Sequence, residues 1–143
     1  MQVEMDNKWE TEGANSNSNL MRVLIVDDEE NTRIGLSKLL SQEGYCIASA
    51  ADGQEAIEYL QEEQWVDVVI TDLKMPQLNG LQLLQELARN YPQIHVVMIT
   101  AYGGVESYLE AINHGAFEYI NKPVKLFELR SVLRKIEEQL ALP

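Results

Sequence analysis

Apolar and polar positions follow a regular block pattern along this chain from Met21 onward. Short apolar runs rich in β-branched residues predict buried strands, and apolar residues three or four positions apart predict amphipathic helices. The pattern predicts five strands, at about residues 22–26, 45–50, 66–71, 94–99 and 117–120, each followed by a helix. This alternation indicates an α/β fold, a doubly wound parallel sheet with helices on both faces.

The ends of the predicted helices carry recognisable signals. Gly44 and Gly115 are expected to stop the first and fourth helices. Asp52 is expected to cap the second helix, and Glu55 completes an acidic version of the capping box. The dipeptide Asn79-Gly80 precedes the third helix. The apolar helix residues are Ile34, Leu36, Leu39 and Leu40 in the first, Leu81, Leu84, Leu87 and Ala88 in the third, Val105, Leu109 and Ile112 on one face of the fourth, and Leu126, Leu129, Val132, Leu133 and Ile136 in the fifth.

Residues 1–20 differ from the rest because they are polar and have no periodicity. Such a segment has too little apolar surface to fold, so we expect a disordered tail and a folded domain over residues 21–143. The last predicted helix ends within a few residues of Pro143. We therefore expect no separate DNA-binding or catalytic output domain in this chain.

The net charge of -12 argues against binding to nucleic acid or to an anionic membrane, since both need basic patches. No apolar run reaches membrane-spanning length, and the N-terminus has none of the features of a signal peptide. The single Cys46 cannot form an internal disulfide and is expected in the core. A cytoplasmic protein is therefore predicted.

Side chains suited to chemistry stand at the C-terminal ends of four predicted strands: Asp27 and Asp28, Asp72, Thr100 and Lys122. Open α/β sheets bind ligands at this edge, so these side chains are expected to converge on one site. Each has an ordinary explanation when taken singly, as a helix cap, a structural hydroxyl or a solvated charge. Their joint placement at four strand ends favours a site.

Three carboxylates in one pocket repel one another unless a cation joins them. Mg²⁺ prefers oxygen ligands and is typically held by one or two carboxylates together with phosphate and water. A backbone carbonyl just after Asp72 could supply one more oxygen. A magnesium ion there would neutralise an incoming phosphoryl group.

Asp72 is the best candidate nucleophile, because a carboxylate that attacks phosphorus gives an aspartyl phosphate. Lys122 would place a point charge on a phosphate oxygen, and the Thr100 hydroxyl could donate a hydrogen bond to another. Pro123 fixes the chain after Lys122 and leaves a cis Lys122-Pro123 bond open.

These motifs together resemble the signatures of a response-regulator receiver domain: Val23–Glu29 (VLIVDDE), Thr71–Pro76 (TDLKMP), Thr100-Ala101 and Lys122-Pro123. The resemblance spans about Met21 to Leu140. The stretches Met98–Gly103 (MITAYG) and Gly115–Ile120 (GAFEYI) are most similar to receivers of the NtrC type. The resemblance implies a flavodoxin-like (βα)5 sheet with strand order 2-1-3-4-5.

The resemblance also implies roles for individual residues. Asp72 matches the phosphoacceptor, and the metal ligands are Asp27, Asp28, Asp72 and the backbone carbonyl of Lys74. Lys122 matches the phosphate-contacting lysine. Thr100 and Tyr119 match the switch pair, in which the Tyr119 ring is expected to exchange a solvent-facing hydroxyl for a buried position. Lys74 and Tyr102 occupy positions that influence phosphoryl lifetime in the family. Asn79 departs from the commoner Asp, but Asn also suits this turn.

The partners implied by the resemblance are a sensor histidine kinase or histidine phosphotransfer protein as phosphoryl donor, and an unidentified output protein. Such a receiver catalyses only its own phosphorylation and dephosphorylation. Its output surface is expected around the fourth helix, the fifth strand and the fifth helix, and it leaves a homodimer of the phosphorylated form open. His95 and His114 are poor candidates for phosphotransfer.

Three alternatives stay open. The chain could be a receiver cut from a larger transcriptional regulator. It could be a phosphatase with an aspartate nucleophile, although such enzymes carry a D-x-D pattern after the first strand, whereas Asp27 and Asp28 are adjacent. A flavin- or nucleotide-binding module lacks support, because the sequence has neither G-x-G-x-x-G nor a P-loop.

Overall fold

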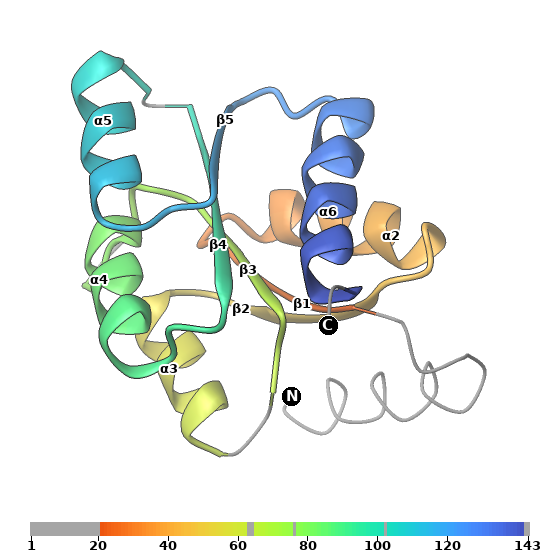
Figure 1. The fold of residues 1–143 in the computed structure, drawn as a ribbon, viewed down its shortest axis with the longest axis horizontal. Helices are drawn as coiled ribbons and strands as arrows, with labels where there is room; N and C mark the ends of the chain where they lie inside the picture. Colours follow the sequence, from red (N-terminus) through yellow and green to blue (C-terminus); the bar gives the residue numbers. More distant parts are fainter. Residues whose placement is uncertain (1–20, 63–64, 76, 102, 142–143) are drawn as a thin grey trace.

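The five strands form one parallel sheet in the order β2-β1-β3-β4-β5 (Figure 1). The computed structural model describes residues 21–62, 65–75, 77–101 and 103–141, so the predicted tail at residues 1–20 lies outside the described residues. The strands are β1 (Arg22–Val26), β2 (Cys46–Ala50), β3 (Val68–Thr71), β4 (His95–Thr100) and β5 (Glu118–Asn121). The predicted flavodoxin-like strand order is confirmed.

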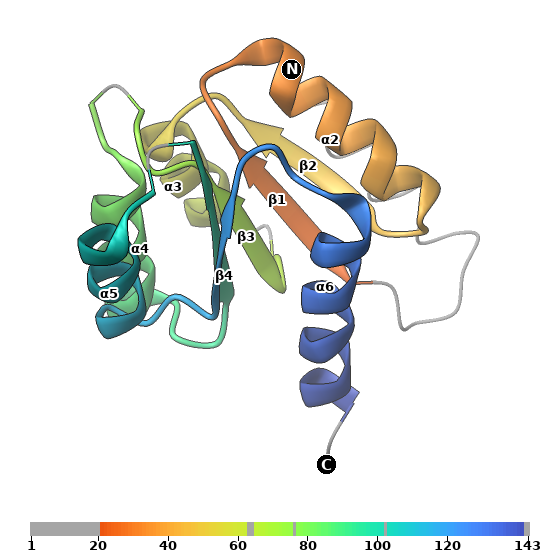
Figure 2. The same cartoon turned by 90° about the horizontal axis from the view of Figure 1, so that it is seen from above.

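Helices cover both faces of this sheet. They are α2 (Glu30–Gln42), α3 (Gly53–Gln61), α4 (Gly80–Asn90), α5 (Val105–Asn113) and α6 (Leu126–Ala141). Figures 1 and 2 show α2 and α6 on one face and α3, α4 and α5 on the other. Each helix in the described part of the chain is too short or too polar to span a lipid bilayer.

Successive strand residues feed two separate cores, because side chains of a strand alternate between faces. In β1, Val23 and Ile25 pack with Leu40 of α2 and the buried residues of α6. Leu24 and Val26 pack on the other face with residues of α3 and α4. Since both faces are buried, the strands are continuous apolar runs rather than alternating ones.

The caps explain where the helices begin. The Asp52 carboxylate accepts a hydrogen bond from the Glu55 N–H at 2.8 Å, as predicted. The Glu55 carboxylate, however, accepts from the N–H of Ala51 rather than from that of Asp52, so the predicted capping box is wrong by one residue. Both reciprocal bonds are present instead at α4, between Asn79 and Gln82.

Several strand limits differ from the prediction by one or two residues. The strand β3 begins at Val68 rather than at residue 66, and Asp67 there directs its carboxylate to the N–H of Arg22 at 3.0 Å. Gly44 and Gly115 follow α2 and α5 with φ of 100° and 105°, the left-handed conformation that glycine adopts readily. Both predicted helix stops are therefore confirmed.

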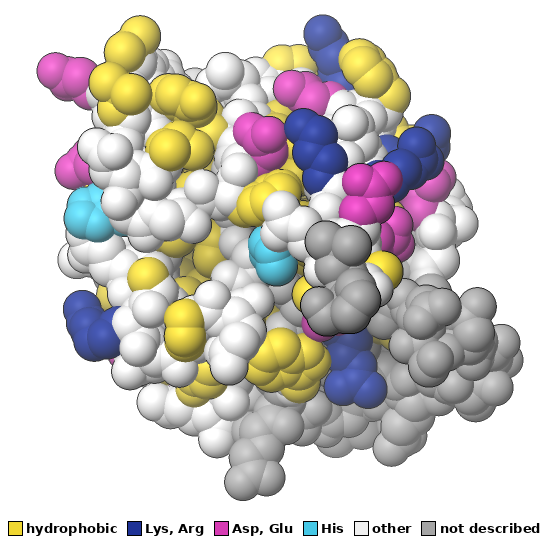
Figure 3. Space-filling model, viewed as in Figure 1, with side chains coloured by type: hydrophobic (Ala, Val, Ile, Leu, Met, Phe, Trp, Pro, Cys, Tyr) yellow, Lys and Arg dark blue, Asp and Glu magenta, His cyan; other side chains and the backbone are white. Residues whose placement is uncertain are grey.

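The predicted apolar face of α5 is largely exposed. Val105 is 75% exposed and Leu109 is 51% exposed, and Ala111 is the buried residue of this helix. Figure 3 shows hydrophobic side chains gathered over α5. The periodicity identified the stripe correctly, but most of it meets solvent rather than the core. Ile34 and Leu39 of α2 are likewise exposed.

Candidate functional site

Three carboxylates meet at the C-terminal edge of the sheet. One ligand oxygen each from Asp27, Asp28 and Asp72 lies within 4.8 Å of the others. They converge because β1 and β3 are adjacent and Val26 is paired with Thr71, so the residues that follow both strands are neighbours. Asp27 and Asp72 are buried, whereas Asp28 is exposed. The predicted convergence of the acids is therefore observed.

An open pocket of about 550 Å³ lies against two of these acids, Asp28 and Asp72. Asp28, Asp72 and Lys122 line it, together with Glu29, Lys74, Met75 and Ala101. Its lining is rich in oxygen ligands from acidic side chains, which are the donors that hard divalent cations prefer. We name it the acidic pocket.

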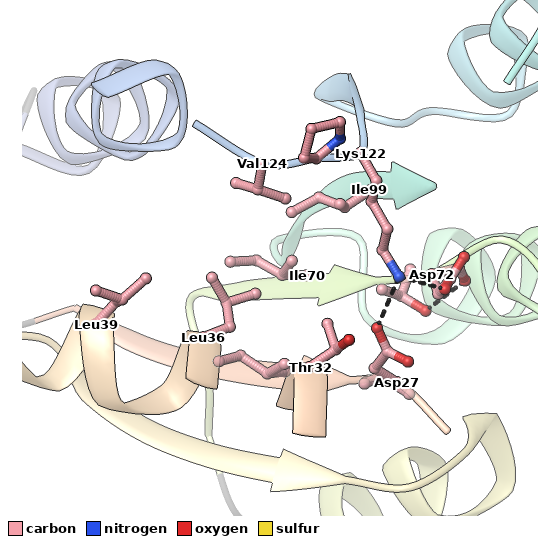
Figure 4. A pocket seen from close by; sticks show the side chains of 13 residues that line it. Asp27, Thr32, Leu36, Leu39, Ile70, Asp72, Ile99, Lys122 and Val124 are labelled. Carbon is pink, nitrogen blue, oxygen red and sulfur yellow. Dashed lines mark hydrogen bonds and ion pairs between the residues drawn. The ribbon is translucent and has the colours of Figure 1, made fainter. Parts of the chain in front are cut away.

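Lys122 joins the two buried carboxylates. Its Nζ lies 2.9 Å from Oδ2 of Asp72 and 3.2 Å from Oδ2 of Asp27 (Figure 4). Burial lowers the pKa of Lys122, but the hydrogen bonds and negative charges of Asp72 and Asp27 outweigh burial and raise it. The ammonium therefore stays charged and offsets charge that would otherwise be buried without a partner.

The backbone fixes both buried carboxylates. The Asp27 carboxylate accepts from the Glu29 N–H at 2.9 Å, and the Asp72 carboxylate accepts from the Lys74 N–H at 3.3 Å. Gly80, at the start of α4, lies against the other side of this loop. A Cβ there would stand 2.1 Å from the Asp72 carbonyl oxygen, so the approach of α4 requires glycine.

Thr100 and Lys122 are joined through the backbone. Thr100 ends β4 and is fully buried, and its carbonyl accepts from the Lys122 N–H at 2.9 Å. The Lys122-Pro123 peptide bond is cis, the form that the sequence left open. Thr100 therefore lies at the same sheet edge as the acids.

Tyr119 departs from one expectation. Its ring packs edge-on against Tyr108, with centroids 5.6 Å apart. The hydroxyl is buried and has no hydrogen-bond partner among the described residues, whereas a solvent-facing hydroxyl was expected. Gly103 lies against it, since a Cβ there would stand 3.1 Å from this hydroxyl. Tyr102, the neighbouring position singled out in the sequence, lies outside the described residues.

A second, mainly apolar pocket of about 250 Å³ lies beside Lys122, and no sequence motif predicted it. Figure 4 shows Leu36 and Leu39 of α2 on one side, Val124 on the other, and Ile70 and Ile99 between them. This apolar pocket shares Asp27, Asp72 and Lys122 with the chemistry of the sheet edge. Its walls come from segments far apart in the chain, which is why local patterns did not reveal it.

Sequence reasoning also missed Arg33 and the capping role of Glu29. Arg33 Nη1 donates to the backbone carbonyl of Asp27 at 2.7 Å. The Glu29 carboxylate caps α2 by accepting from the N–H and hydroxyl of Thr32, and these hydrogen bonds lower the pKa of Glu29. A basic residue in the first turn after an acidic run was the available signal for Arg33.

The other singled-out residues lie away from this site. His95 begins β4 and contacts Gln139 and Phe117. His114 follows α5, and its ring Nε2 lies 3.4 Å from the amide Nε2 of Gln85. Cys46 is a buried cysteine at the start of β2.

The fold is that of an α/β protein with a parallel sheet in the order 2-1-3-4-5. At the C-terminal edge of this sheet a lysine bridges the acidic cluster, and this arrangement is suited to binding a metal ion and a phosphate. The chain belongs to the response regulator receiver domain family, which matches residues 23–134. Regulatory protein AtoC of Escherichia coli (strain K12) is 37% identical over 114 residues, covering 80% of this chain and 24% of AtoC. AtoC is an NtrC-type regulator, so the predicted likeness to NtrC-type receivers is confirmed.

Solved structures agree. A response regulator receiver domain from Clostridium thermocellum superposes with a TM-score of 0.79 and 31% identity, covering 84% of this chain and 96% of that one. TrrA from Thermotoga maritima, in complex with Mg(2+)-BeF, has a TM-score of 0.74 and 33% identity, covering 82% of this chain and 99% of TrrA. The chain spans only 24% of AtoC and 51% of the response regulator RppA of Synechocystis. The chain is thus a response-regulator receiver domain of a two-component system.

Proposed function

We propose that Asp72 accepts a phosphoryl group from a phosphohistidine on a sensor kinase or histidine phosphotransfer protein. The observation that carries this proposal is the position of Asp72, which lines the open acidic pocket and receives the Lys122 ammonium at 2.9 Å. Asp27 touches the same ammonium but does not line the acidic pocket, and Asp28 lines it without contacting the lysine. Asp72 alone among these acids meets both conditions.

The residues present fit a magnesium ion. Asp27, Asp28 and Asp72 offer oxygen ligands within reach of one another, and the Lys74 carbonyl would provide another. The pocket's 550 Å³ leaves room for water and a phosphoryl group. When bound, Mg²⁺ would supply positive charge against the phosphoryl oxygens. The Mg(2+)-BeF complex of TrrA supports this assignment.

The chemistry then falls to the side chains. An Asp72 carboxylate oxygen attacks phosphorus, the phosphorus–nitrogen bond of phosphohistidine breaks, and its electron pair stays on the imidazole nitrogen, which is protonated by solvent. Lys122 holds one phosphoryl oxygen, and the Thr100 hydroxyl donates to another. Attack of water on the acyl phosphate returns the carboxylate and inorganic phosphate. The domain therefore catalyses only its own phosphorylation and dephosphorylation.

The exposed side chains of α5 support an output surface on α5, β5 and α6. Val105, Tyr108 and Leu109 are uncovered, and Tyr108 contacts the switch residue Tyr119 directly. The partner that binds this surface is an output protein, a second phosphorylated copy, or a further domain. A further domain is included because the relatives are much longer than this chain. A cytoplasmic location and a domain starting near Met21 remain predictions.

The phosphatase alternative receives less support, because the candidate nucleophile follows β3 and the family match spans nearly the whole domain.

The test of Asp72 as the phosphoacceptor is covalent labelling with acetyl phosphate and Mg²⁺, followed by intact-mass measurement. One base-labile phosphoryl group is expected on the wild type and on Asp67→Asn, a control at the opposite end of β3. Asp72→Asn should carry none. Equal labelling of Asp72→Asn and wild type would place the nucleophile elsewhere.

A further inference from the structure

Arg33 contacts the loop between β1 and α2 at two points. Its Nη1 donates to the Asp27 carbonyl at 2.7 Å, and its backbone N–H donates to the Glu29 carbonyl at 3.0 Å. The side chain is half-buried, so its reach is constrained. Asp28, a proposed metal ligand, lies between these two anchor points.

Asp28 depends on that loop for its position. Within the described part of the chain, its carboxylate makes no hydrogen bond or ion pair, and the residue is exposed. Asp27, in contrast, is held by its N–H to Ala50, by its carboxylate to the Glu29 N–H, and by Lys122. Only the backbone therefore directs the Asp28 carboxylate toward the other two acids.

The Asp27 carbonyl oxygen belongs to the peptide unit that joins Asp27 to Asp28. Because the peptide unit is planar, a hydrogen bond to this oxygen also sets the direction of the Asp28 N–Cα bond. Two further hydrogen bonds hold the chain on either side of this peptide unit. The Asp27 N–H donates to the Ala50 carbonyl, and the Glu29 N–H donates to the Asp27 carboxylate. The Arg33 guanidinium is the side chain that holds the plane between them.

We propose that Arg33 is a positioning residue for the metal site, which holds the Asp27-Asp28 peptide so that the Asp28 carboxylate faces the acidic pocket. This inference rests on the proposed binding of Mg²⁺ by Asp27, Asp28 and Asp72. Arg33 acts through the backbone and does not contact the metal.

The charge of Arg33 acts in the opposite direction. A guanidinium near three carboxylates repels an incoming cation, so its removal would tighten Mg²⁺ binding if charge alone mattered. Loss of the positioning bond would weaken binding instead. The sign of the change therefore separates the two effects. Lys38, an exposed cation on the same helix, provides a matched control for lost charge.

The experiment is a Mg²⁺ titration of the full chain without phosphoryl donor. Binding is measured by calorimetry and by the NMR signals of the Asp27–Glu29 amides. Arg33→Ala should raise the Kd for Mg²⁺ about tenfold, the scale seen for lost outer-shell partners. Lys38→Gln should leave Kd unchanged or slightly lower. Arg33→Lys keeps the charge but not the fork geometry, and its Kd should fall between wild type and Arg33→Ala.

A second readout separates positioning from chemistry. With acetyl phosphate, Arg33→Ala should need more Mg²⁺ for half-maximal labelling, while the rate at saturating Mg²⁺ equals that of wild type. A folded Arg33→Ala with unchanged or tighter Mg²⁺ binding overturns the inference and leaves the proposed function intact. If Arg33→Ala does not fold, Arg33→Lys decides by the same criterion. Absence of Mg²⁺ binding by the wild type overturns both.

Discussion

The Lys122 ammonium lies 2.9 Å from the Asp72 carboxylate, the proposed phosphoacceptor. The same ammonium lies 3.2 Å from Asp27, so one lysine offsets two buried acids. A divalent cation in the acidic pocket would perform the same task from the open side. Lys122 and Mg²⁺ are therefore two alternative sources of positive charge for one set of carboxylates.

Replacing Lys122 by Met should make folding depend on the metal. Without Mg²⁺, the free energy of unfolding should fall by about 2 kcal/mol, because two buried carboxylates lose a charged hydrogen-bond partner. With saturating Mg²⁺ the deficit should shrink, and the Kd for Mg²⁺ should fall below that of wild type. Urea unfolding in EDTA and in Mg²⁺ measures this. Lys125→Met, which removes an exposed charge nearby, serves as the control. An equal deficit in both buffers would contradict the prediction.

Tyr119 and Tyr45 should respond oppositely to loss of their hydroxyls. The Tyr119 hydroxyl has no partner among the described residues, so Tyr119→Phe should raise the free energy of unfolding by about 1 kcal/mol. The hydroxyl of the buried Tyr45 interacts with the Glu137 carboxylate, so Tyr45→Phe should lower it by about 1 kcal/mol. Thermal and urea unfolding of the two variants test the contrast. A loss of stability in both would mean that the Tyr119 hydroxyl has a partner.

Tyr45 also predicts how stability depends on alkaline pH. Burial and the negative charges of Glu137 and Glu43 raise its pKa to about 12, against a smaller opposing effect of Arg134. A folded-state pKa above the unfolded value of 10.0 stabilises the fold below pH 10. That contribution is lost as pH rises toward 12, because the unfolded chain then releases the proton first. Tyr45→Phe should flatten this part of the stability curve.

Register explains why so much of the site was predictable. Parallel strands align their C-terminal ends, so Asp27 and Asp72 must meet once β1 and β3 are neighbours. Buried parallel strands can be recognised in the sequence as apolar runs, and the acids that follow these runs can be recognised with them. Strand order itself came from the family resemblance, since alternation alone does not rank the strands.

What the sequence did not reveal depends on side-chain conformation and on tertiary cover. Arg33 donates to a backbone carbonyl six residues back, a contact that helical periodicity does not predict. The Tyr119 hydroxyl is buried because Gly103 lies against it, a contact between a loop and β5. The stripe of α5 has the same periodicity as a buried one, so the pattern does not distinguish Val105 from a core residue.

Two glycines provide a matched pair. A Cβ at Gly80 would meet the Asp72 carbonyl at 2.1 Å, so Gly80→Ala should destabilise the fold by roughly 3 kcal/mol and slow phosphorylation by shifting Asp72. Gly35, inside α2, has nothing within 4 Å of such a Cβ. Gly35→Ala should stabilise the fold by about 1 kcal/mol through helix propensity and leave phosphorylation unchanged. Urea unfolding and labelling of both variants test this, and a neutral Gly80→Ala would contradict the close approach.

Leu39 tests whether the donor protein contacts α2. It is 43% exposed and also lines the apolar pocket beside Lys122. Leu39→Glu should slow transfer from a phosphohistidine protein about tenfold, as expected for a lost apolar anchor, and leave labelling by acetyl phosphate unchanged. Leu140→Glu, equally exposed at 44% but at the far end of α6, is the control. Equal slowing with both donors would indicate damage to the site rather than lost recognition.

The last prediction concerns the switch. A phosphoryl group on Asp72 should draw the Thr100 hydroxyl toward it and move the loop that continues through Gly103. Since Gly103 lies against the buried Tyr119 hydroxyl, the environment of Tyr119 must change, and Tyr108 on the α5 surface contacts that ring. Beryllofluoride, which mimics the phosphoryl group, should therefore shift NMR signals across residues 103–120 in the wild type. In Thr100→Ala the shifts should be confined to the acidic pocket. Equally wide shifts in Thr100→Ala would remove Thr100 from the pathway, and wild-type shifts that stop at the pocket would exclude Tyr119 as the relay.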